Sequence, residues 1–156
     1  MTTNILKFFV LAITATVMGW PVSTGVGQEV PSAKVAYFAH QQVEAAFAKG
    51  ETLTQGRAGN ADYRVVTSRR DQPGLAELHG LDTDIIYVTQ GTALFVTDGT
   101  ILNGRNTAPN ETRGSSIQGG SPHKLGPGDI IIVPHGVPHW FKDVQPPFTY
   151  LVVKVR

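Results

Sequence analysis

From residue 63 onward, hydrophobic and polar residues alternate along much of the chain, as in short β-strands with one buried face. β-Branched and aromatic residues dominate segments 63–68, 85–89 and 92–97. The continuous apolar run 130–133 is expected to form a strand buried on both faces, and 148–155 to form the closing strand. Short strands of this kind predict an all-β barrel.

Turn signals separate these segments. Gln90-Gly91 and the stretch 126–129 are expected to be turns, and the dipeptide Asp98-Gly99 predicts a hairpin that leads into a short strand at 100–102. Residues 103–120 are rich in Gly, Asn and Ser, and are expected to form a long loop.

The segment 32–49 has the pattern of a helix. Ser32 can cap it, Val43 and Phe47 fall on an apolar face together with Val35 and Phe38, and Gly50 would end it. We expect this helical arm, within 28–62, to cover an edge or end of a barrel formed by 63–156.

Residues 1–27 have the pattern of a secretory signal peptide. Lys7 precedes an apolar run, Pro21 breaks it, and small residues stand at 25–27, where a signal peptidase cleaves. The alternative is a retained membrane anchor, but the apolar run is short for a bilayer span of about 20 residues. The sequence therefore predicts a periplasmic or secreted protein.

Composition adds three limits. The hydrophobic content of 41% over 156 residues suits one core and one folded domain. Without Lys7 the chain carries 12 basic residues (13 minus one) against 12 acidic ones, so neither nucleic acid nor, after signal cleavage, a membrane is an expected partner. No helix-turn-helix segment is visible, which disfavours a transcriptional regulator.

Two separated groups of residues carry the candidate chemistry. In the first, Glu77 and His79 stand two apart, so on a strand they share one face. Asp84 follows just past a turn, on the next antiparallel strand, and can point to the same interior. Gly91 comes seven residues later.

The second group comprises Gly128, Pro134, Gly136 and His139. The two groups resemble the paired motifs of the cupin family. The spacing from Asp84 to Gly91 agrees with the first motif, and all four residues of the second group stand at the positions of the second motif. Two positions depart from the pattern, because Glu77 stands where the family has its first His and Asp84 where it has a Glu.

The resemblance implies a single-domain cupin (double-stranded β-helix, or jelly-roll) barrel, preceded here by the helical arm. It also implies that Glu77, His79, Asp84 and His139 occupy the four metal-ligand positions. Two imidazoles and two carboxylates suit a divalent ion such as Zn, Mn, Fe or Ni. Asp84 is shorter than Glu, so it can bind directly, act through water, or orient His79 from outside the coordination sphere. The competing hypothesis is a metal-free site that hydrogen-bonds its ligand.

Other residues near the motifs leave alternatives open. His123 is the candidate catalytic acid or base at the barrel mouth, or else a surface histidine, and His135 is expected to be exposed. Arg69-Arg70 is either a surface pair or a clamp for a carboxylate or phosphate. The aromatic residues that line the pocket or fill the core are Tyr87, Phe95, Trp140 and Phe141.

Two classes of function remain. The first is a metal-dependent enzyme of the dioxygenase, isomerase or lyase type acting on a small oxygenated organic molecule. The second is a non-catalytic cupin that binds a sugar or carboxylate, with or without metal. A small molecule is the expected partner in both, and many cupins form homodimers, so a homodimer is the expected assembly.

Overall fold

A computed structural model describes residues 34–156, so the predicted signal peptide and the predicted cap Ser32 lie outside the described residues. These residues form a helix followed by short and long strands. In chain order the elements are α1 (His40–Lys49), β1 (Thr52–Ala58), β2 (Ala61–Arg70), β3 (Ala76–His79), β4 (Thr83–Thr97), β5 (Thr100–Leu102), β6 (Arg105–Ala108), β7 (Glu111–Gly114), β8 (Ser116–Gln118), β9 (Ser121–Leu125), β10 (Ile130–Val133) and β11 (His139–Val155).

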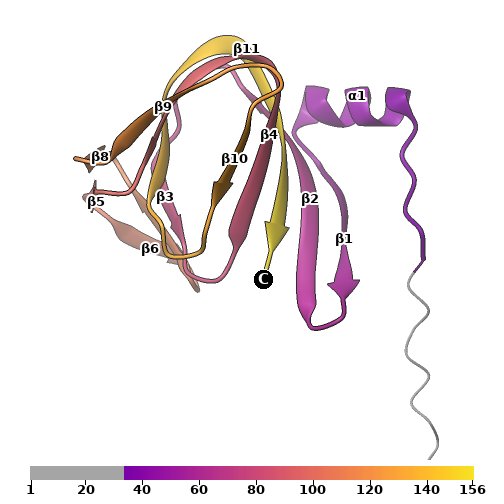
Figure 1. Ribbon diagram of the computed structural model, residues 1–156, viewed down its shortest axis with the longest axis horizontal. Coiled ribbons are helices and arrows are strands. Elements are labelled where there is room, and N and C mark those ends of the chain that lie inside the picture. The colour runs from indigo at the N-terminus through magenta and orange to yellow at the C-terminus, as the bar shows by residue number, and fades with distance from the viewer. Residues whose placement is uncertain (1–33) are drawn as a thin grey trace, which may run out of the picture. The chain divides into compact units, whose positions relative to one another are not determined.

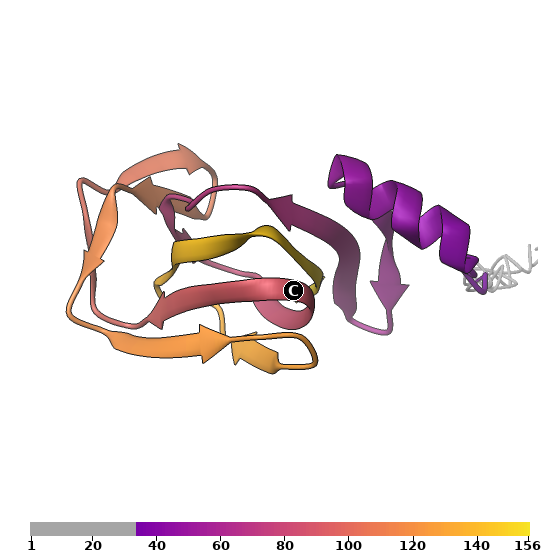
Figure 2. The same ribbon diagram turned by 90° about the horizontal axis from the view of Figure 1, so that it is seen from above.

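The two longest strands, β4 and β11, form the spine of the sheet (Figure 1). β11 pairs antiparallel with β2, β3 and β4, and β4 also pairs with β9 and β10. Apart from β4, β9 and β10, the strands of this sheet lie in the order β1-β2-β11-β3-β7-β6. Seen from above in Figure 2, the strands curl around a common interior, and this confirms the predicted all-β barrel.

The core fills one part of that interior. Phe95 and Phe148 are fully buried, and their rings pack against Phe141, which is 4% exposed. Of the other aromatic residues, Trp140 is half-buried and donates from Nε1 to Gly74 O at 2.8 Å, while Tyr87 points outward and is 44% exposed. Phe95 and Phe141 are therefore core residues.

Gly91 bends a strand and does not separate two of them. The chain continues as one strand through Thr83–Thr97, and Gly91 adopts φ 75° in the middle of it. A Cβ on Gly91 would lie 2.5 Å from Pro147 O and 2.8 Å from Gln145 O. The bend lets both halves of β4 stay paired with β11, whose register shifts between Gln145 and Thr149 opposite it.

Three further expectations were wrong. Ile130 and Ile132 on β10 are 65% and 59% exposed, because nothing among residues 34–156 covers the outer face of this strand. Thr100–Leu102 pairs with β8 and not with the strand before Asp98-Gly99. The expected loop 103–120 holds short strands, since its polar residues pair edge to edge in β6 and β7.

The N-terminal arm contains a helix and a strand. The helix begins at His40, eight residues later than predicted, and ends as predicted at Gly50, whose φ is 68°. Its apolar side, Val43, Ala46 and Phe47, faces the sheet, whereas Val35 precedes the helix and is 95% exposed. β1 was not predicted and forms a hairpin with β2.

Within residues 34–156, no helix has the length and apolar character that crossing a lipid bilayer requires.

Replacing Gly91 with Ala should destabilise the barrel. The new Cβ would clash with two backbone carbonyls, and a non-glycine residue in the left-handed region costs a further ~1–3 kcal/mol. Gly119→Ala is the matched control, because Gly119 has φ 74° with nothing within 4 Å of an added Cβ. Urea unfolding should therefore show a clearly larger loss for Gly91→Ala. Equal losses would contradict the steric argument.

Candidate metal centre

The two sequence motifs meet because β11 begins beside β3. His139, the first residue of β11, pairs with Glu77. The turn before it is held by two hydrogen bonds, Val137 N to Pro134 O at 3.2 Å and Gly136 N to His79 O at 2.7 Å. Gly136 has φ 77°, a conformation that favours glycine. The second motif is thus bonded to the backbone of a residue in the first.

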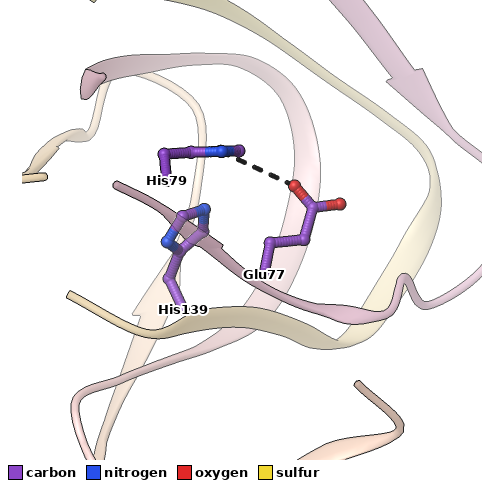
Figure 3. A group of neighbouring side chains, drawn as sticks. All are labelled: Glu77, His79 and His139. Atoms are coloured by element: carbon purple, nitrogen blue, oxygen red, sulfur yellow. Dashed lines mark ion pairs between the residues drawn. The ribbon is translucent and has the colours of Figure 1, made fainter. Parts of the chain in front are cut away.

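Glu77, His79 and His139 point toward one another inside the barrel (Figure 3). Each offers one ligand atom, and these atoms all lie within 4.8 Å of one another. The two histidines are 5% and 4% exposed, and their ring centroids are 5.0 Å apart. Three of the four predicted metal ligands therefore form a compact group.

Hydrogen bonds on the outer ring nitrogens leave the inner ones free for a cation. His79 Nδ1 lies 2.9 and 2.8 Å from the two Glu111 oxygens, and His139 Nδ1 lies 3.1 Å from Val137 O. Both acceptors require a proton on Nδ1, so each ring turns its Nε2 inward, where a neutral imidazole offers a lone pair. His79 Nε2 is buried without a hydrogen-bond partner. This donor set fits a divalent ion.

Glu111 is the residue that sequence reasoning missed. It lies on β7 directly opposite His79, a pairing between residues 32 positions apart in the chain. No spacing or composition signal marked it, because its partner is set only by strand register. A carboxylate that accepts from Nδ1 fixes the orientation of the ring and raises its basicity as a ligand.

Asp84 is within reach of the group but belongs to an ion pair. Its oxygens lie 2.6 and 2.7 Å from Lys154 Nζ, and Oδ2 is 3.4 Å from His79 Nε2 and 4.0 Å from His139 Nε2. Asp84 does not contact Nδ1 of His79, so orientation of that ring falls to Glu111. Its placement leaves direct or water-mediated binding of an ion open.

The Glu77 carboxylate is also paired. Arg113 Nη1 lies 3.2 Å from one oxygen, and His79 Nε2 lies 3.7 Å from the other. Glu77 is thus held by a cation on β7 while its second oxygen faces the imidazole group.

The charges of the site shift its protonation equilibria. Burial alone lowers the pKa of His79, but the carboxylates of Asp84 and Glu111 outweigh burial and raise it above the ordinary value. Burial raises the pKa of Asp84, yet His79 and Lys154 together bring it below its usual range. Burial lowers the pKa of His139, which favours a neutral imidazole there.

A cavity of about 590 Å³ opens beside this group and is lined by Glu77, Asp84 and His139. Its volume lies within the range of small-molecule binding sites, about 300–1,000 Å³. Much of the rest of its wall comes from β2 and β11, with further residues from β1, β4, β7 and the segment before β3.

The remaining histidines lie outside the group. His123, on β9, contacts Thr97 Oγ1 through Nε2 at 3.0 Å and is not part of the cavity wall. Its role as an acid or base stays a prediction. His135 is exposed in the turn, as expected.

Comparison with known sequence families agrees with this architecture. The sequence family described as Cupin matches residues 60–156. No curated protein sequence matches the chain.

Solved structures with a similar fold include the DMSP lyase DddQ from Ruegeria pomeroyi DSS-3, with 23% identity and a TM-score of 0.40 over 62% of this chain and 39% of that one. KdgF from Halomonas sp. shows 14% identity and a TM-score of 0.48 over 78% of this chain and 94% of that one. A recombinant oxalate oxidase in complex with glycolate shows 18% identity and a TM-score of 0.40 over 61% of this chain and 41% of that one. The chain thus spans less than half of the first and third of these proteins.

Replacing Glu111 with Ala should weaken metal binding about 10- to 100-fold, because the His79 ring loses the acceptor that orients it. Titration with Zn²⁺ of the metal-free protein measures the change. Glu44→Ala, which removes an exposed carboxylate on α1, serves as the control and should bind Zn²⁺ like the wild type. Equal affinities for Glu111→Ala and wild type would show that Glu111 has no orienting role.

Proposed function

Because the chain belongs to the cupin family, we propose that its barrel holds a divalent ion at Glu77, His79 and His139, with Asp84 as a fourth or water-linked ligand. The observation that carries this proposal is the buried, unpartnered Nε2 of His79, beside the Nε2 of His139. A buried polar atom without a partner is costly unless a ligand satisfies it. Zn, Mn, Fe and Ni all suit the donor set.

The proposed activity is that of a metal-dependent enzyme on a small oxygenated organic molecule, of the dioxygenase, isomerase or lyase type. A divalent ion would supply Lewis acidity toward a substrate oxygen. The chain's own contribution would be to fix both imidazoles through Glu111 and Val137, and to hold the substrate in the adjacent cavity. The Tyr150 hydroxyl and the Lys154 ammonium also line that cavity, where they contact Arg70 and Asp84.

A non-catalytic binding protein is the second candidate, and one observation favours it. Both carboxylates that would bind the ion already pair with cations, Asp84 with Lys154 and Glu77 with Arg113. A site neutralised in this way can bind a sugar or carboxylate through hydrogen bonds alone. Incubation with candidate molecules after metal loading separates the two: an enzyme converts its ligand, whereas a binding protein releases it unchanged.

The proposed ion should be found at roughly one equivalent per chain by elemental analysis of the purified protein. His139→Ala should abolish loading, because it removes one of the two imidazole ligands, whereas His135→Ala should leave the metal content unchanged. Metal-free protein that resists loading, and melts at the same temperature with and without added ions, would refute the metal site. Equal losses from both variants would place the site elsewhere.

We also propose that the protein acts in the periplasm or outside the cell after cleavage near residue 27. Expression of the full chain in a bacterial host with N-terminal sequencing of the product tests this. The mature protein should begin close to Gln28 and appear in the periplasmic or extracellular fraction. Uncleaved protein that sediments with membranes would support the retained anchor.

A further inference from the structure

The neighbouring residues Arg69 and Arg70 have opposite surroundings. Successive side chains of a strand point to opposite faces, and these two are the last residues of β2. Arg69 is exposed and pairs with Asp71 at 3.1 Å. Arg70 is half-buried and lines the cavity beside the metal centre. Of these two arginines, Arg69 is therefore at the surface and Arg70 faces the cavity.

The guanidinium of Arg70 is fixed from several sides. Its Nε donates to the Tyr150 hydroxyl at 3.0 Å, and its Cζ lies 4.6 Å from the centre of the Phe141 ring. Tyr150 and Phe141 are 5% and 4% exposed, so both contacts of Arg70 are with buried core residues. A Cβ on Gly74 would lie 2.5 Å from Nη1, so the glycine leaves the space that the guanidinium takes. A cation ordered in advance loses little entropy when it binds an anion.

Arg70 has no ion-pair partner among residues 34–156, although the cavity contains acids. The two acids of the wall are already neutralised, Glu77 by Arg113 and Asp84 by Lys154. The charged residues of the wall are Arg64, Arg70, Arg113, Lys154, Glu77 and Asp84. Two cations thus remain in excess, and the terminal nitrogens of Arg70 have no hydrogen-bond partner in the described part of the chain.

The position of Arg70 relates it to the metal centre. Arg70 stacks on Phe141, which comes two residues after His139 on β11. The side chains of Phe141 and His139 therefore project from the same face of this strand, about 7 Å apart. Between these two ends the cavity wall, which is mostly polar, carries one apolar patch, formed by Val152 with Val66 and Ile86 on the neighbouring strands. A ligand that reaches both ends needs an anionic group joined to a short carbon chain.

We propose that Arg70 binds the carboxylate of a small organic acid, whose carbon chain lies along this apolar patch and whose other end faces His139. This inference rests on the proposed function for the contact at His139, and it names small organic acids as the ligand class of the cavity. A planar guanidinium matches a carboxylate through two parallel hydrogen bonds. The apolar patch gives the carbon chain of an organic acid a contact that inorganic phosphate cannot make.

Isothermal titration calorimetry with succinate tests the proposal on both metal-free and Zn²⁺-loaded protein. Succinate should bind, and its uncharged analogue succinamide and inorganic phosphate should each bind at least about 10-fold more weakly. Arg70→Met should weaken succinate binding by at least about 10-fold, since the charge-assisted pair is lost. The metal content of this variant should equal that of the wild type.

Two further variants test the geometry. Arg70→Lys keeps the charge but not the planar fork, and should bind succinate with an affinity between those of Arg70→Met and the wild type. Arg69→Met removes the same charge one residue away and is the matched control, which should bind succinate like the wild type.

The proposal is overturned if wild-type protein does not bind succinate, or binds succinamide or phosphate as tightly. It is also overturned if Arg69→Met and Arg70→Met lose the same affinity, or if Arg70→Met loses none. A failure of the metal proposal gives a different result: no Zn²⁺ loads, yet metal-free protein still binds succinate in a manner that depends on Arg70. Such a result supports the carboxylate site and refutes the metal centre.

Discussion

The rest of the site depends on one backbone contact, the hydrogen bond from Gly136 N to His79 O. It joins the turn before β11 to the end of β3, two segments separated by more than fifty residues of chain. Because β11 starts at that turn and then pairs with β3, β4 and β2, the same contact aligns the strand that carries His139, Phe141 and Lys154. Gly136 adopts φ 77° in that turn, a left-handed conformation that favours glycine.

The charges of the interior are balanced pair by pair. Glu77 lies beside Arg113, Asp84 beside Lys154, and Glu111 accepts from His79. An unpaired buried charge would cost far more than any of these pairs contributes, so each acid inside the barrel has a partner. Among residues 34–156, the groups at the cavity without a partner include His79 Nε2 and the half-buried guanidinium of Arg70. These two groups define the chemistry proposed for the cavity: a cation bound to nitrogen at one end and a carboxylate bound to arginine at the other.

Local patterns predicted much of the fold. Alternation located the strands, and the turns at Gly128 and Gly136 have the positive φ that such positions require. Errors arose where the outcome depended on a neighbour. The run at 130–133 has an uncovered outer face because no described element packs against it, and the polar stretch 103–120 forms strands because its segments pair with each other and with neighbouring strands. The sequence pattern shows which residues favour burial or a strand, but the neighbouring elements decide whether a residue is buried or paired.

For the site, the sequence by itself determined that Glu77 and His79 share a face and that His139 follows a glycine turn, because both follow from spacings within a few residues. Only the tertiary structure decided that Glu111 orients His79, that Lys154 holds Asp84, and that Arg70 faces the cavity while Arg69 faces solvent. The first two depend on register between strands distant in the chain. The last depends on which face of β2 the barrel encloses, and a shift of one residue in that register would exchange the two arginines.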